Sequence, residues 1–121
     1  MAVDWDRLFR EFDGRCAYCG KDLLTDLDTY MGSVADHIVP KNADGSDDQP
    51  NRALSCAACN IFKGHFNPQE GDSTKTKEQL IERARTLIFE RRSNKINQFI
   101  GYLKEFRKVK PVDEANDPGA K

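Results

Sequence analysis

The stretch CAACNIFKG, residues 56–64, decides the fold, because its first four residues repeat the C-x-x-C spacing of CAYC at residues 16–19. Each pair can place two thiolates on one ion, and two pairs complete a tetrahedral site of four sulfurs, the usual donor set of structural zinc. Gly20, directly after the first pair, favours the tight turn of a zinc knuckle. A redox role for the dithiols is the alternative. The predicted zinc ligands are Cys16, Cys19, Cys56 and Cys59.

Length and composition indicate a small protein that is soluble in water. Its 121 residues are enough for one domain with a modest core, and 32% of them are charged. No stretch has the length of a transmembrane helix, and the N-terminus lacks the layout of a signal peptide. We therefore expect a cytoplasmic protein without membrane contact, in which the thiols stay reduced. Bound zinc would then add its binding free energy to that of the small core.

The net charge of −1 conceals two segments of opposite sign. Residues 1–50 carry five Lys or Arg against eleven Asp or Glu, whereas residues 74–110 carry eleven against four. A basic segment in a near-neutral protein is typical of a surface that contacts phosphate backbones, and also of a solvated helix face. Charge alone leaves both interpretations open.

Short elements are predicted for the first half of the chain. Apolar residues recur at helical spacing from Trp5 to Phe12, with Asp4 or Asp6 as the N-cap and Gly14 as the end. The polar residues that follow the first cysteine pair read as a loop, and a second loop follows at Pro40. Between these loops, we expect a strand over residues 30–39. After the second loop, we expect a helix over residues 57–62 that ends at Gly64.

A long amphipathic helix is predicted from Leu80 to Phe106, or two helices joined at Ser93–Asn94. Its apolar stripe would pack on the core or on a partner helix, so a homodimer through this helix is one expectation. Residues 67–110 are accordingly interpreted as a helical extension, and residues 111–121 as a disordered tail. The preceding residues 1–66 would form the zinc-stabilised domain with its leading helix.

The pair Asp36–His37 lies between the two cysteine pairs, and the chain has only two histidines. In a strand, neighbouring side chains point to opposite faces. Two adjacent polar residues that both take part in chemistry would therefore need a strand end or a bulge. A solvated edge strand with a polar pair is the alternative interpretation.

The motif begins with the first C-x-x-C pair. The elements that follow it along the chain are Asp36-His37-Ile38-Val39-Pro40, Gly45, Asn51 and the stretch CAACNIFKG, which contains the second cysteine pair. This order and spacing resembles the HNH endonuclease family over residues 16–64, about half of the chain. The resemblance implies a ββα-metal (His-Me finger) fold, in which a hairpin and a helix are clamped by zinc. The expected fold class is thus α+β, with a leading helix and a long C-terminal helix or helix pair around the nuclease core.

The resemblance also assigns roles to individual residues. It makes His37 the general base, Asp36 and Asn60 the ligands of a divalent ion, and Asn51 the residue that holds the loop backbone in place. A neutral imidazole suits proton abstraction near pH 7. The third motif position is Asn60 and not histidine, which makes this the H-N-N form. Because an amide oxygen is a harder ligand than imidazole, this form favours Mg²⁺ or Mn²⁺ as the catalytic ion.

The helix geometry is consistent with these roles. Cys59 and Asn60 diverge by about 100° around a helix, so one can face zinc while the other faces the catalytic ion. Lys63 shares the face of Asn60 and is a candidate for a phosphate contact. Tyr18 is interpreted as a packing residue, and His65 as a loop residue near DNA. The predicted DNA-binding residues are Lys63, Arg52, Arg91 and Arg92.

The function expected from this pattern is metal-dependent hydrolysis of phosphodiester bonds in DNA. Such chemistry needs an activated water, a cation that neutralises phosphate charge, and a rigid scaffold. One active site per chain cuts one strand, and no sequence-reading module is visible, so a weakly specific nicking enzyme is predicted. A zinc-stabilised nucleic-acid-binding or interaction module without catalysis is the alternative.

Overall fold

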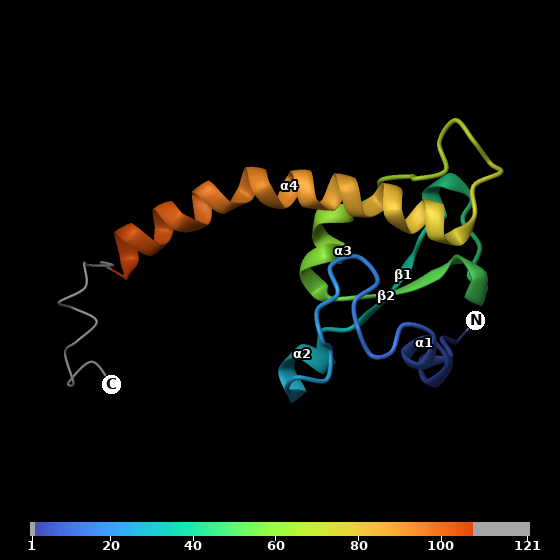
Figure 1. The fold of residues 1–121 in the computed structure, drawn as a ribbon, viewed down its shortest axis with the longest axis horizontal. Coiled ribbons are helices and arrows are strands. Elements are labelled where there is room, and N and C mark those ends of the chain that lie inside the picture. The colour runs from blue at the N-terminus through green and yellow to red at the C-terminus, as the bar shows by residue number, and fades with distance from the viewer. Residues whose placement is uncertain (1, 108–121) are drawn as a thin grey trace. The chain divides into compact units, whose positions relative to one another are not determined.

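The computed structural model describes residues 2–107, so the predicted helix end at residue 110 and the predicted tail 111–121 lie outside the described residues. The chain divides into two compact units, Met1–Glu90 and Arg91–Lys121. Figure 1 shows the elements in chain order. They are α1 (Trp5–Glu11), α2 (Leu27–Met31), β1 (Val34–His37), η1 (Lys41–Ala43), η2 (Gln49–Asn51), β2 (Arg52–Ser55), α3 (Ala57–Lys63) and α4 (Lys77–Phe106).

The first unit is built on a two-stranded antiparallel sheet and the helix that follows it. Strand β1 pairs with β2 in a register that sets Val34 opposite Ser55 and His37 opposite Arg52. All four residues of β2 are buried. Helix α3 begins directly after Cys56 and ends at Gly64, as predicted. This ββα arrangement confirms the α+β class.

Helix α1 also follows its sequence signals. The Asp4 side chain accepts a hydrogen bond from the Arg7 amide at 3.1 Å, which makes Asp4 the N-cap. Leu8 is fully buried, whereas Trp5 is 42% exposed. The aromatic face of this helix therefore contributes to the core through only part of its length.

The strand predicted over residues 30–39 is wrong at both ends, because Tyr30 and Met31 belong to the short helix α2, and Ile38 and Val39 follow the last residue of β1. Asp26 caps this helix by accepting a hydrogen bond from the Thr29 amide at 2.7 Å, and Gly32 ends it. The capping signals outweigh the apolar run, since Met31 is 70% exposed and Tyr30, whose ring contacts Phe9, is 45% exposed. Strand β1 is left with only four residues.

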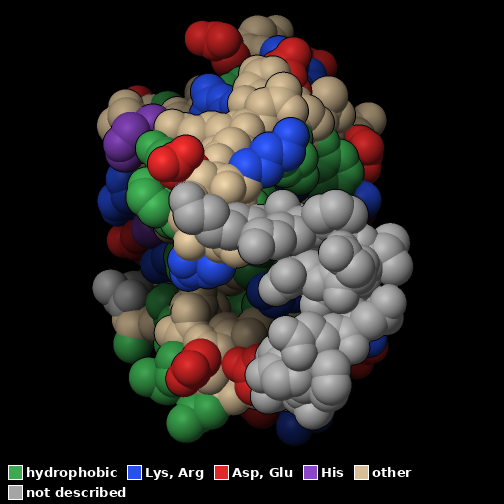
Figure 2. Space-filling model, turned by 90° about the vertical axis from the view of Figure 1, so that its left-hand side faces the viewer, with side chains coloured by type: hydrophobic (Ala, Val, Ile, Leu, Met, Phe, Trp, Pro, Cys, Tyr) green, Lys and Arg blue, Asp and Glu red, His purple; other side chains and the backbone are tan. Residues whose placement is uncertain are grey.

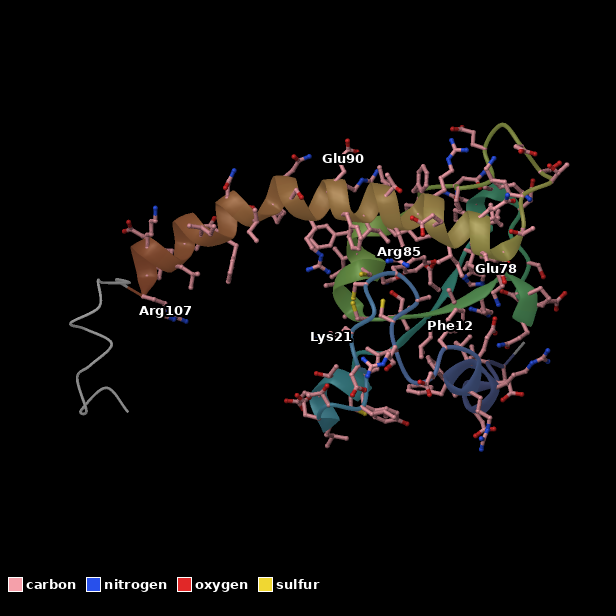
Figure 3. The ribbon with its side chains drawn as sticks, viewed as in Figure 1. Phe12, Lys21, Glu78, Arg85, Glu90 and Arg107 are labelled. Carbon is pink, nitrogen blue, oxygen red and sulfur yellow. The ribbon has the colours of Figure 1, made fainter. Side chains whose placement is uncertain are left out.

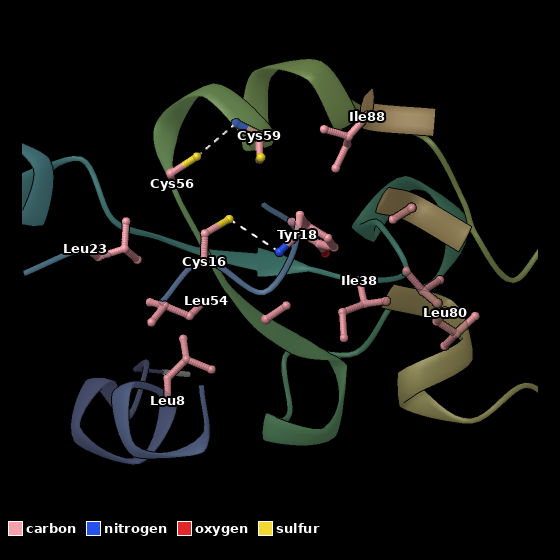
Figure 4. Packing of buried hydrophobic residues seen from close by; sticks show 13 residues of the cluster. Leu8, Cys16, Tyr18, Leu23, Ile38, Leu54, Cys56, Cys59, Leu80 and Ile88 are labelled. Carbon is pink, nitrogen blue, oxygen red and sulfur yellow. Dashed lines mark hydrogen bonds between the residues drawn. The ribbon is translucent and has the colours of Figure 1, made fainter. Parts of the chain in front are cut away.

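The core of the first unit joins α1, the zinc turns, the sheet and the beginning of α4 (Figure 4). Helix α4 starts at a reciprocal cap, in which Thr76 and Gln79 each bond the other's backbone amide through a side-chain oxygen. From this start, α4 contributes Leu80, Ala84 and Ile88, spaced by four residues along one helix face. The remaining buried apolar residues are Leu8, Cys16, Tyr18, Leu23, Ile38, Val39, Ala53, Leu54, Cys56 and Cys59.

The helix α4 runs through Ser93–Asn94 without a break and extends into the second unit, Arg91–Lys121. Side chains project from all sides of this stretch (Figure 3). Five of its large apolar residues are between 40% and 65% exposed, whereas Leu103 is partly buried: the five are Ile96, Phe99, Ile100, Tyr102 and Phe106. A partner for this stripe, and a homodimer through it, stay predictions. Among residues 2–107, no helix is both long and apolar enough to span a lipid bilayer.

Candidate active site and metal centre

The four cysteines form one cluster in the first unit. Their sulfur atoms all lie within 4.8 Å of one another, and Cys19 Sγ is 3.8 Å from Cys56 Sγ. A tetrahedral zinc site with Zn–S bonds of about 2.3 Å requires sulfurs about 3.8 Å apart. All four are free of disulfide bonds. The donor set and the spacing therefore fit a structural zinc ion, as the two C-x-x-C pairs predict.

Local backbone geometry turns the sulfurs toward one another. Gly20 adopts a φ of +78° and donates its amide to the Cys16 carbonyl, which closes the first turn. Amides also point at two sulfurs: Tyr18 N lies 3.4 Å from Cys16 Sγ and Cys59 N lies 3.3 Å from Cys56 Sγ (Figure 4). Hydrogen bonds from the neighbouring Cys56 and Cys59 thiols lower the pKa of Cys16. The hydrogen bonds with Cys16 and Cys56 raise the pKa of Cys59, and burial raises the pKa of Cys19, so the thiolate is favoured at Cys16 and disfavoured at these two thiols.

Asp36 and His37 lie where strand β1 ends. His37 is the last residue of the strand, so the alternation of side chains stops there and both residues reach the same pocket. This pocket has a volume of about 330 Å³. Its lining residues are Asp36, His37, Pro40, Lys41, Asn42, Gly64 and His65. Because β1 ends at His37, two adjacent polar side chains can line the same pocket without a bulge in the strand.

The carboxylate of Asp36 is buried and held through one oxygen. Asp36 Oδ2 accepts a hydrogen bond from the Tyr18 hydroxyl at 2.5 Å and lies 3.2 Å from Lys63 Nζ. Burial, and then the Asp36 carboxylate, raise the pKa of Tyr18, so its hydroxyl stays protonated and donates. Both contacts described for this carboxylate among residues 2–107 use Oδ2, and none uses Oδ1. Tyr18, interpreted from sequence as packing, also orients this carboxylate.

Lys63 lies in the interior. Its side chain is fully buried, and Nζ donates to the His37 carbonyl at 3.0 Å in addition to the ion pair with Asp36. Helix α3 and the end of β1 are joined by these contacts. A phosphate contact requires an exposed ammonium group, which Lys63 does not offer in this arrangement.

Arg52, another predicted DNA contact, also lies in the interior. Its residue exposure is 7%, and its guanidinium donates to the carbonyls of Ala35 at 3.0 Å and Asp47 at 3.1 Å. These bonds fasten the loop before β2 to the opposite strand. Sequence position alone does not distinguish such a buried arginine from an exposed one.

We expect Lys63→Met to lower the free energy of unfolding by roughly 3 kcal/mol, because it leaves the buried Asp36 carboxylate without its cation. Urea denaturation of the purified protein measures this change. Lys104→Met is the matched control, since Lys104 is an exposed lysine of α4. Equal stability of the two variants would contradict a structural role for the Lys63–Asp36 pair.

Asn51 fastens the loop between the two strands. Its amide nitrogen donates to the carbonyls of Val39 at 2.9 Å and Ser46 at 2.8 Å, and its oxygen accepts from the Val39 amide at 2.8 Å. The two ends of the loop are thereby held together next to His37. This is the arrangement expected of a residue that holds the loop backbone.

Asp47, which the sequence analysis did not single out, contacts the imidazole directly. His37 Nε2 lies 2.8 Å from Asp47 Oδ1, and Lys41 Nζ lies 3.1 Å from Asp47 Oδ2. The hydrogen bond with His37, and then the one with Lys41, lower the pKa of Asp47 to about 2. Asp47 is one of three aspartates in the loop 44–48, so only the folded structure shows which one reaches the histidine.

Residues 16–66 match the family model described as HNH endonuclease. This segment is an HNH domain. It contains both cysteine pairs, both strands and helix α3, and thus the whole of the site described above. The match indicates a function on nucleic acid. No curated protein matches the chain.

The roles of three residues that the sequence singles out stay predictions. Asn60 is half-buried on α3, one turn before Lys63, and its role as a ligand in an H-N-N motif stays a prediction. Arg91 and Arg92 lie at the start of the second unit, and their contacts with DNA also stay predictions.

Proposed function

We propose that the HNH domain is a metal-dependent endonuclease that hydrolyses phosphodiester bonds in DNA. The observation that carries the proposal is the pocket at the end of β1, where Asp36 and His37 meet. A buried carboxylate with one oxygen held, beside a partly exposed imidazole, would provide a ligand and a base at neighbouring positions. One such site per chain would nick one strand, with little preference for base sequence.

The proposed roles follow from the atoms available in the pocket. Asp36 Oδ1 and the amide oxygen of Asn60 are hard donors that fit Mg²⁺ or Mn²⁺. When bound, such an ion would supply positive charge for the phosphate and the leaving oxygen. His37 would take the proton of the attacking water, while Asn51 and the Lys63–Asp36 pair keep the loop and the strand end in position. Proton transfer and orientation are thus the tasks of this chain's own residues.

Affinity for DNA is proposed to come from phosphate contacts outside the pocket. The segment 74–110 carries the excess of Lys and Arg, and Arg91 and Arg92 lie within it. On the coloured part of the face drawn in Figure 2, basic side chains lie near acidic ones. Such a distribution favours weak binding that does not depend on sequence.

One observation favours the alternative of a binding module without catalysis. The Lys63 ammonium lies 3.2 Å from the carboxylate that would hold the ion, and this positive charge opposes cation binding at Asp36. A zinc-stabilised module that only contacts nucleic acid would have no need of an ion there. The presence or absence of metal-dependent cleavage distinguishes the two functions.

We expect the zinc-loaded protein to convert supercoiled plasmid to the nicked form with Mg²⁺ or Mn²⁺. Brief treatment with EDTA should stop cleavage, and added Mg²⁺ should restore it, because an open oxygen site exchanges its ion faster than a closed site of four sulfurs. Agarose gels measure the cleavage, and elemental analysis measures the zinc. Binding of DNA without cleavage under any divalent ion would support the non-catalytic module.

A further inference from the structure

The loop 44–48 supplies the only described side-chain partner of the His37 imidazole among residues 2–107. Asp47 Oδ1 lies 2.8 Å from Nε2, within ordinary hydrogen-bond distance. The side chain of His37, which lines the pocket, is 26% exposed, and that of Asp47, which does not line it, is 36% exposed. A carboxylate that contacts one imidazole nitrogen determines which of the two ring nitrogens carries the proton in the neutral form.

Asp47 is itself held from two other directions. Lys41 Nζ lies 3.1 Å from Oδ2, and the guanidinium of the buried Arg52 lies 3.6 Å from Oδ1 and donates to the Asp47 backbone carbonyl. These positive groups favour the ionised carboxylate, which can only accept hydrogen bonds. The contact with His37 therefore requires a proton on Nε2. In the neutral imidazole, Nδ1 is then the nitrogen with the free lone pair.

We propose that Asp47 is the positioning residue of His37: it binds the protonated Nε2, fixes the tautomer of the imidazole and leaves Nδ1 to accept the proton of water. The use of Nδ1 as a base rests on the proposed nuclease function, whereas the tautomer itself does not. Because β1 ends at His37, the strand constrains the ring less than it would at a central position. The carboxylate of Asp47 supplies the missing constraint from the loop that Asn51 and Arg52 fasten.

The tautomer can be observed directly, without DNA and without a catalytic ion. The chain has only two histidines, so ¹⁵N-labelled histidine gives two sets of ring signals, and a His65→Gln variant assigns them. At a pH where the imidazoles are neutral, we expect His37 to show a protonated Nε2 and an unprotonated Nδ1. In Asp47→Ala, the ring should exchange between both tautomers.

The kinetic readouts separate positioning from general stability. For Asp47→Ala we expect kcat for plasmid nicking to fall by about 10- to 100-fold with KM nearly unchanged, since misplaced groups cost rates of this order. Asp47→Asn should retain most of the tautomer preference and part of the rate. Its amide oxygen would face His37 and the buried Arg52, because the exposed Lys41 can turn away from the amide nitrogen.

Asp48→Ala is the matched control, because Asp48 is the neighbouring aspartate, is exposed, and makes no side-chain capping bond. It should change neither the spectrum nor kcat. A wild-type His37 with its proton on Nδ1, or a tautomer unaffected by Asp47→Ala, would overturn the inference. If Asp47→Ala does not fold, the wild-type spectrum and Asp47→Asn still decide it. A wild-type protein with the expected tautomer but no nuclease activity would refute the proposed function alone.

Discussion

His37→Ala is expected to reduce DNA nicking by about 10²- to 10⁴-fold, the range that loss of a general base typically costs. The imidazole is at the end of β1 and lines the pocket, and its described side-chain partner is Asp47. The backbone carbonyl that Lys63 binds remains in the alanine variant. The substitution therefore removes the proposed base while the contacts of the fold remain. Initial rates on supercoiled plasmid, at saturating Mg²⁺, measure the change.

The controls for this variant are its zinc content and its unfolding curve, and both should equal those of the wild type. A folded His37→Ala protein that nicks plasmid at the wild-type rate would show that another group activates the water. A loss of zinc or of cooperative unfolding would instead show that the imidazole has a structural role that its contacts do not indicate.

Cys56→Ser is expected to abolish zinc binding and, with it, the folded state of the first unit. Zinc in such sites contributes apparent binding energies of about 10 kcal/mol or more to folding. Cys56 is also the N-cap of α3, where its sulfur accepts a hydrogen bond from the Cys59 amide. Serine is a good N-cap, so the substitution retains the cap and removes only the metal ligand. Elemental analysis and circular dichroism measure the two losses.

Ala58→Ser is the matched control for this experiment, because Ala58 lies within the same C-x-x-C pair, is exposed and binds no metal. It should retain zinc and fold normally. A metal-free Cys56→Ser protein that unfolds cooperatively at the wild-type urea concentration would show that the sulfur cluster is dispensable for the fold.

Local signals explain which parts of the fold could be predicted from the sequence. The paired cysteines indicated their cluster because a tetrahedral ion imposes a spacing on its ligands. The Asp4 cap and Gly64 indicated the beginning of α1 and the end of α3 because capping depends on neighbouring residues. Asp26 and Gly32 cap α2 in the same way, but the prediction from sequence does not use these two residues and places Tyr30 and Met31 in the strand.

The contacts of the site were less predictable, because they join residues that are distant in sequence. Lys63 and Arg52 have the charge expected of DNA contacts, yet both are buried against partners from other elements. Asp47 reaches His37 only because the loop is folded back by Asn51 and Arg52. A residue type specifies what a side chain can bond, but the tertiary fold decides which partner it meets.

Tyr18 has a consequence for any attempt to move the proposed active site to another scaffold. Its backbone amide donates to the sulfur of Cys16, and its hydroxyl donates to the carboxylate of Asp36, so one rigid side chain connects the first cysteine turn to strand β1. A hairpin and helix transplanted without the turn at residues 16–20 would lose this connection. The smallest transferable unit of this protein therefore includes the knuckle, the tyrosine and the strand end together.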